Sequence, residues 1–150
     1  IIEDCVDRSE KVVIFSNYNE VLNTMFELLK HNGINSLLYT GEIDKKVREN
    51  RLKNFKENSK NFILLLNSHI GGEGLTITEA SNVIFLNEWW NPSSNRQAED
   101  RVNRIGQKKI PNIFVLRSKN TIDQLIGEIL SKKNKLEIEF EKALLSEFLN

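Results

Sequence analysis

The chain has little cysteine and proline, no excess of charge of either sign, and no long apolar run. A single cysteine, Cys5, excludes an internal disulfide and a cysteine-built zinc cluster. Its 21 basic and 21 acidic residues cancel, which excludes a strongly basic footprint for the whole chain but leaves room for a basic face. The longest apolar run, "FILLL", is far shorter than the ~20 residues that span a bilayer. No signal-peptide pattern is present either, so we expect an intracellular protein without a membrane partner.

The composition suits one compact domain with a proper core. The chain has 150 residues, of which 39% are hydrophobic and 28% are charged. It begins at Ile1 and not at Met, so we expect a fragment of a longer protein.

Short β-rich runs alternate with helical stretches along the chain. This order predicts an α/β fold, in which a parallel sheet carries helices on both faces. The apolar "FILLL" run is typical of a strand that is buried on both sides. The expected strands are residues 11–16, 34–40, 61–67, 81–87 and 112–118.

Capping residues predict where the first helices begin. Asn17 with Glu20 has the spacing of a cap and its reciprocal partner, and the helix that follows stops at Gly33. Asp44 is the expected cap of the next helix. Its predicted inner face consists of Ile43, Val47, Leu52 and Phe55.

The second half of the chain predicts two further helical regions. Asn91 caps a helix with Pro92 at its first position, and Gly106 is its expected end. Thr121 with Gln124 forms a capping box that opens a long charged stretch, which we expect to contain two helices broken near Asn134.

Two unusual segments follow predicted strands. "SHIGGEGLT" (68–76) is rich in glycine and could cradle phosphate through its backbone amides, or it could simply be a tight turn. It lacks the Gly-x-x-x-x-Gly-Lys-Ser/Thr spacing of a Walker loop. "NEWWNP" (87–92) follows the next strand. In a parallel sheet the two segments should therefore share the carboxyl edge, where ligands gather.

Arg101 and Arg104 are three residues apart, so on a helix they would share a face with Gln97 and Asp100. Two guanidiniums beside a glycine loop could grip a phosphate through bidentate hydrogen bonds. The alternative is a solvated helix face on which the arginines pair with nearby acidic residues. Surface pairs contribute only ~0–1 kcal/mol, so stability gives little reason for them.

In an extended segment, Trp89 and Trp90 would point to opposite sides, one into the core and one toward a contact surface. The alternative is that both pack under the last helix. His31 and His69 lie far apart, so we predict no metal site. Charges such as "SKKNK" (131–135) read as a solvated helix face, and no complete catalytic system is present.

The order of these motifs resembles the second RecA-like lobe of Swi/Snf-like ATPases, the DNA-translocating branch of superfamily-two helicases. "KVVIFSNY" is similar to the opening strand of that lobe, and "QAEDRVNRIGQ" resembles the sixth helicase motif. "NSHIGGEGLTITEASNVIFLNEWWNP" resembles the fifth motif and its extension. "YTGEIDKKVRENRLKNF" matches the family's spacing at Gly41, Arg48, Leu52 and Phe55.

The resemblance implies a RecA-like domain organisation and a role for each matched residue. Residues 1–10 would link to a preceding lobe, 11–118 would form the RecA-like lobe, and 119–150 would add C-terminal brace helices. Catalysis would rest on Arg101, Arg104 and Gln97, and ATP binding on Gly72, Glu73, Gly74 and the same two arginines. DNA would be contacted by Ser16, Asn17, Ser68, His69, Gly71 and Trp90.

The resemblance also implies the ligands and partners of the whole protein. The first lobe of the parent chain would hold most of the ATP and Mg²⁺, so we expect the isolated fragment to be inactive. The expected polymer is double-stranded DNA, with nucleosomes or other protein–DNA complexes as further candidate partners. The location would be nuclear in a eukaryote and cytoplasmic otherwise.

Three positions depart from the family's pattern, and two other readings stay open. The family usually has Lys or Arg where His69 stands, histidine at Asn103, and an acidic residue at Asn87. One alternative is a noncatalytic module that keeps the fold and binds nucleic acid or protein. The other is a lobe of an RNA-acting helicase.

Overall fold

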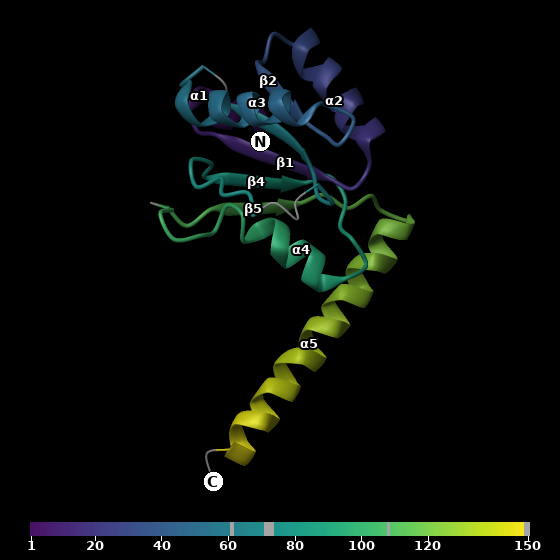
Figure 1. The fold of residues 1–150 in the computed structure, drawn as a ribbon. Helices are drawn as coiled ribbons and strands as arrows, with labels where there is room; N and C mark the ends of the chain where they lie inside the picture. Colours follow the sequence, from purple (N-terminus) through teal and green to yellow (C-terminus); the bar gives the residue numbers. More distant parts are fainter. Residues whose placement is uncertain (61, 71–73, 108, 149–150) are drawn as a thin grey trace.

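A five-stranded parallel sheet forms the centre of the fold (Figure 1). The computed structural model describes residues 1–60, 62–70, 74–107 and 109–148, with side chains as far as residue 142. The strand order is β2-β3-β1-β4-β5, and every neighbouring pair is parallel. The strands are β1 (Val12–Ser16), β2 (Ser36–Tyr39), β3 (Ile63–Asn67), β4 (Asn82–Phe85) and β5 (Asn112–Val115). The predicted parallel α/β sheet is confirmed.

Helices cover both faces of the sheet, as the sequence predicts. One core cluster joins α1 (Ile2–Asp7) and α2 (Asn19–His31) to the sheet face that carries Ile14. The other cluster joins α3 (Lys45–Glu57) and α4 (Pro92–Glu99) to the face that carries Phe15. Strand side chains alternate between the two clusters because successive residues of a strand point to opposite faces.

The N-terminal part of the chain differs from the sequence prediction in two ways. Residues 1–10, expected as a linker, contain α1, and its Cys5 is 1% exposed in the core. The cap of α2 is Tyr18 and not Asn17, and no side chain caps it. Asn17 lies outside the helix because its backbone makes tertiary hydrogen bonds instead, donating to Asn87 and accepting from Asn67.

Helix α3 confirms its predicted cap and corrects its predicted inner face. The Asp44 side chain accepts from the backbone N–H of Lys46 at 2.9 Å. Phe55 is fully buried and Leu52 packs against the core, but Val47 is 42% exposed. Val47 does not pack on the core, so its placement on the inner face was wrong.

Helix α4 is shorter than the sequence predicts. Asn91 caps it and Pro92 begins it, as expected. It ends at Glu99, however, and the chain then continues in turns to Gly106, whose φ is +105°. Arg101 and Arg104 therefore do not share a helix face with Gln97, and other contacts must position them.

The C-terminal region forms a single helix, α5 (Ile122–Phe148), which runs outward from the body (Figure 1). The predicted break near Asn134 is wrong, because neither Gly nor Pro interrupts the chain after Gly127 and asparagine alone does not end a helix. Thr121 accepts from the N–H of Asp123, while Gln124 accepts from that of Asn120, one residue before the expected one. Among the described helices, none has the length and apolarity to cross a membrane.

We expect truncation of Phe55 to destabilise the fold strongly. Phe55→Ala removes a fully buried ring and should lower the free energy of unfolding by ~3–5 kcal/mol. Val47→Ala, on the same helix but exposed, should change it by no more than ~0.5 kcal/mol. Thermal melting of the two variants measures the difference. Equal losses would show that α3 packs through its first turn as well.

Candidate functional site

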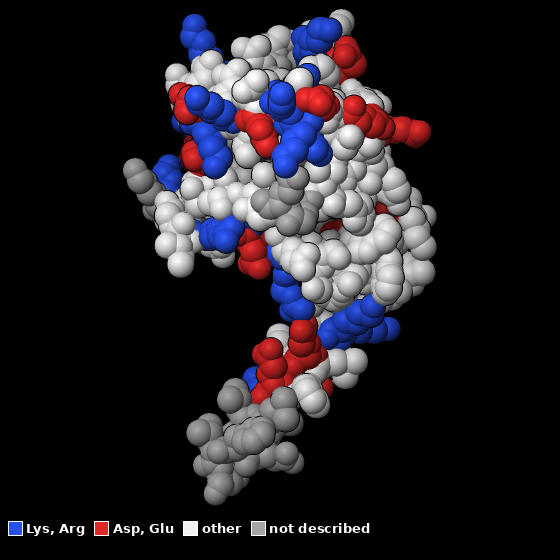
Figure 2. Space-filling view, viewed as in Figure 1, with Lys and Arg blue, Asp and Glu red and all other residues white. Residues whose placement is uncertain are grey.

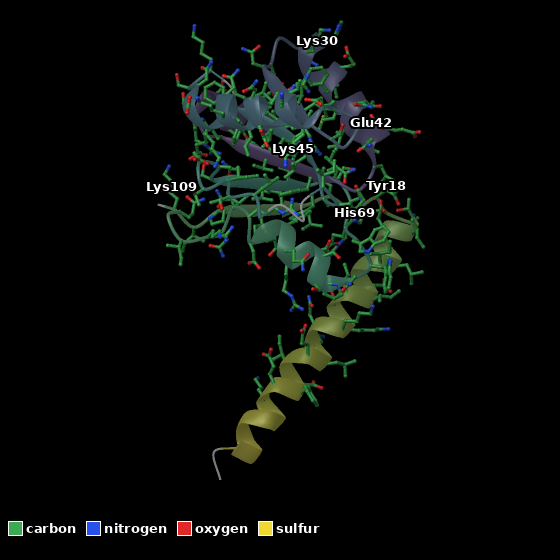
Figure 3. All side chains as sticks on the ribbon, in the orientation of Figure 1. Tyr18, Lys30, Glu42, Lys45, His69 and Lys109 are labelled. Atoms are coloured by element: carbon green, nitrogen blue, oxygen red, sulfur yellow. The ribbon has the colours of Figure 1, made fainter. Side chains whose placement is uncertain are left out.

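The segments that follow β3 and β4 meet at the carboxyl edge of the sheet. The rings of His69 and Trp89 pack edge to face, with 4.9 Å between their centroids. The backbone N–H of Ser68 donates to Ser16 O at 3.0 Å, so the first residue after β3 is tied to the end of β1. Figure 3 shows Tyr18, Glu42 and His69 on this side of the sheet and Lys109 on the opposite side. The predicted shared edge is confirmed.

Asn87 joins the ends of β1 and β4. Its Oδ1 accepts from the Ser16 hydroxyl at 2.7 Å and from the Asn17 backbone N–H at 3.3 Å. Ser16 is fully buried, so its hydroxyl supports the edge and does not face solvent. We therefore replace the DNA contact expected for Ser16 with a structural role. The sequence singled out Asn87 only as a departure from a pattern and gave no sign of this role.

A second asparagine, Asn67, organises the neighbouring turn. Its Nδ2 donates to Asn19 Oδ1 at 2.6 Å, and its Oδ1 accepts from the backbone N–H of His69 at 2.9 Å. His69 is exposed and Ser68 is half-buried, which suits contact with a ligand at this edge. Asn17 is half-buried beside them. The expected site residues Gly71, Gly72 and Glu73 lie outside the described residues.

The two tryptophans occupy different environments. Trp89 is half-buried, and the side chain of Asn95 clamps its backbone by accepting from its N–H at 3.0 Å and donating to its O at 2.9 Å. Trp90 is 55% exposed. This exposure agrees with the predicted surface position of Trp90. It argues against the alternative that both tryptophans are buried under the last helix, although Lys133 of α5 lies over the Trp90 ring.

Arg101 and Arg104 both turn toward the segment that follows β3. The Arg101 guanidinium donates to Ile70 O at 3.3 Å. Arg104 donates to Gly74 O at 3.3 Å and to the Thr76 hydroxyl at 2.9 Å. The expected proximity of the two arginines to the glycine loop is thus confirmed, although turns and not a helix bring them there.

The two arginines differ in burial. Arg101 is only 8% exposed, and this burial lowers its pKa below the usual arginine value, an effect that nearby Tyr39 partly offsets. Arginine remains charged in proteins even so. Arg104 is exposed. A buried guanidinium is costly to keep in a low-dielectric place, which fits a group that recognises an anion.

An open pocket lies where these elements meet. Gln97, at the end of α4, is exposed and lines it together with both arginines. Gly74, whose φ is +54°, also lines it. The remaining lining residues are Leu75, Asp100, Asn103 and Ile105. The pocket brings together the described members of the predicted nucleotide site.

The arrangement can bind an anion. Guanidinium groups form strong charge-assisted hydrogen bonds with phosphate oxygens. Within the described ranges, no three His, Cys, Asp or Glu side chains are placed to hold a metal ion. The pocket lining carries two guanidiniums, the amides of Gln97 and Asn103, and the carboxylate of Asp100, and the guanidiniums suit it to a phosphate ligand.

Comparison with known proteins agrees with this geometry. The family described as helicase conserved C-terminal domain matches residues 1–106. The chain is 35% identical over 130 residues to a lymphoid-specific helicase of Homo sapiens, covering 87% of this chain and 16% of that protein. It is also 35% identical over 129 residues to the DNA repair protein RAD5B of Arabidopsis thaliana, covering 85% of this chain and 10% of that protein. The chain thus spans a small part of these relatives.

Solved structures show the same fold. The C-terminal part of the Fun30 ATPase domain superposes with a TM-score of 0.79 and 33% identity, over 84% of this chain and 41% of that one. The Sulfolobus solfataricus SWI2/SNF2 ATPase core domain gives a TM-score of 0.73 and 29% identity, over 90% of this chain and 27% of that one. The chain therefore belongs to the helicase conserved C-terminal domain family, as a second lobe of the SWI2/SNF2 type.

Proposed function

We propose that this chain is the second ATPase lobe of an ATP-driven translocase that acts on double-stranded DNA. The observation that carries the proposal is the pocket where Arg101, Arg104 and Gln97 face the segment that follows β3. The names of the relatives, which include helicases and a DNA repair protein, support DNA as the polymer.

The residues present fit one side of an ATP site. Arg101 and Arg104 donate to the backbone oxygens of Ile70 and Gly74 at 3.3 Å, and Arg104 also donates to the Thr76 hydroxyl at 2.9 Å. Phosphate oxygens carry negative charge and are stronger acceptors than these neutral carbonyls. The donors are therefore suited to the polyphosphate of ATP, with Mg²⁺ held by carboxylates of the first lobe of the same parent chain.

Arg101 and Arg104 have different roles in this proposal. Bound Mg-ATP supplies the phosphoryl group that water accepts. Arg104, which is exposed, is positioned to neutralise charge on that group across the interface between lobes. Arg101 is held more rigidly by burial and shapes the pocket wall, and Gln97 adds an amide beside them. Because the groups that hold Mg-ATP would belong to the first lobe, hydrolysis would require the two lobes to close.

DNA is the proposed trigger for that closure. Ser68, His69, Asn17 and Trp90 lie along the carboxyl edge, where they would contact one strand of the duplex. In the segment that begins at Ser68, Ile70 O accepts a hydrogen bond from the Arg101 side chain. Ile77 N–H, further along the same segment, donates to the backbone O of Arg101. DNA that shifts this segment would therefore act directly on the arginines.

The main alternative is a noncatalytic module that keeps the fold, and a second is an RNA-acting lobe. A module without ATP chemistry has no need of a guanidinium buried as deeply as that of Arg101. We therefore favour the ATPase reading. Nucleosomes or other protein–DNA complexes remain candidate targets of the complete protein.

Replacing Arg104 should remove most DNA-stimulated ATP hydrolysis from the complete protein. An arginine that crosses to the transferring phosphoryl group contributes about 10³–10⁵ in rate. We expect Arg104→Ala to lose activity on that scale, while ATP affinity changes far less because the first lobe holds most of the nucleotide. Steady-state ATPase assays and nucleotide titrations measure both quantities.

Arg8→Ala is the matched control for this loss. Arg8 is also exposed, but it pairs with Glu10 next to α1 and does not line the pocket. It should leave turnover unchanged. Near-normal turnover by Arg104→Ala would place Arg104 on a solvated surface and remove the ATPase reading of the pocket.

Replacing Trp90 should lower the DNA stimulation of ATP hydrolysis more than the rate of hydrolysis without DNA. One lost stacking contact costs ~1–3 kcal/mol in proteins that bind single strands. We expect Trp90→Ala to lower the DNA stimulation of ATP hydrolysis, and hydrolysis without DNA to fall far less. Phe140→Ala truncates a similarly exposed aromatic residue on α5 and should change neither.

Thermal melting of Trp90→Ala separates a contact residue from a packing residue. Because Trp90 is 55% exposed, its loss should lower the free energy of unfolding much less than Phe55→Ala does. A loss as large as that of Phe55→Ala, with every activity falling together, would contradict the DNA role.

A further inference from the structure

One lysine of α5 lies against the exposed tryptophan. The Nζ atom of Lys133 is 4.9 Å from the centroid of the Trp90 ring and donates to Trp90 O at 3.4 Å. The sequence placed Lys133 within a solvated charged run, 131–135, and assigned it no function. It lies beyond residue 106, where the match to the family ends.

Two contacts bring the part of α5 around Lys133 onto the body of the fold. Leu130 is only 4% exposed, and Glu137 pairs with Arg96 of α4 through two hydrogen bonds of 2.8 and 2.9 Å. Leu130, Lys133 and Glu137 are spaced by three and four residues and so share one face of the helix. In Figure 2, basic side chains lie next to acidic ones along α5.

This pair combines the two groups that proteins use to hold a nucleic-acid strand. An aromatic ring has two faces and can accept a sugar or a base on one of them. Lys133 lies over one face of the Trp90 ring, so the sugar or base would take the other face while the ammonium meets a phosphate of the backbone. More than half of the Trp90 side chain is open to solvent. Lys133 has three donors, of which the Trp90 carbonyl takes one, so the ammonium can also bind a phosphate oxygen.

We propose that Trp90 and Lys133 form a composite contact for one strand of duplex DNA, with the ring against the sugar or base and the ammonium on the adjacent phosphate. The inference rests on the proposed DNA-translocating function and extends its DNA track from the RecA-like lobe onto α5. The Arg96–Glu137 pair positions α5 so that the lysine reaches the strand.

The salt dependence of DNA binding tests the phosphate contact. Binding of the complete protein to a labelled double-stranded oligonucleotide is measured across a salt series. Each phosphate contact contributes about −0.9 to the slope of log affinity against log salt. Lys133→Ala should make the slope shallower by about 0.9, and Lys133→Arg should restore it. Lys135→Ala removes the same charge from the opposite side of α5 and should leave the slope unchanged.

A second variant separates phosphate binding from mere attachment of the helix. Glu137→Gln weakens the pair with Arg96 but leaves Lys133 in the chain. It should lower the affinity for DNA but change the salt slope by less than the ~0.9 expected for one phosphate contact. The inference is overturned if Lys133→Ala gives the same slope as Lys135→Ala. It is also overturned if Lys133→Ala changes the affinity and the slope only as much as Glu137→Gln does.

The outcomes also distinguish this inference from the function on which it rests. A protein that does not bind duplex DNA at all would remove both. A protein that binds DNA, and loses affinity in Trp90→Ala but keeps its slope in Lys133→Ala, would remove only the role of α5.

Discussion

The backbone hydrogen bond from Ile77 N–H to Arg101 O, 2.8 Å long, fixes the geometry on which the candidate site depends. Both partners lie outside regular secondary structure, and the bond joins the segment after β3 to the turns that follow α4. The same turns are also held to the end of α4, because Val102 N–H donates to Glu99 O at 2.9 Å. Gln107 adds a donation to Ala80 O at 2.8 Å, and the fully buried Val102 anchors the turns between them in the core. The segment that follows β3 and the segment that follows α4 therefore form one interlocked unit.

This interlock connects Arg101 to the carboxyl edge through one stretch of chain. Ser68 begins that stretch beside β1, and Ile77 ends it against Arg101. Asn87 ties the next strand to the same edge through Ser16. Ile77 is fully buried, and Ile70 and Leu75 pack against the core, so a displacement of this stretch would be felt by core residues. Under the proposed function, a polymer at the edge would act on the pocket through this stretch.

The sequence predicted those features that follow from local rules. The strands could be predicted because apolar runs alternate with helical stretches. The helix caps Asp44 and Asn91 could be predicted because capping depends on neighbouring residues. The early end of α4 and the exposure of Val47 depend on where each helix meets the sheet, which no local pattern records. The hydrogen bonds of Asn87 could not be predicted from hydrophobic periodicity either, because they join residues about 70 positions apart in the chain.

The position of α5 depends on weaker contacts than the rest of the fold. Leu130 is its buried anchor on the body, while the Arg96–Glu137 pair is 52% and 43% exposed and is therefore largely screened by water. Glu99, whose pKa is raised by burial and by the neighbouring charges of Asp100 and Glu88, lies in the same groove between α4 and α5. Acidic side chains crowd this groove, and Arg96 offsets part of their repulsion. A helix held in this way can shift at small cost, so whatever contacts Lys133 and Trp90 also helps to decide where α5 lies.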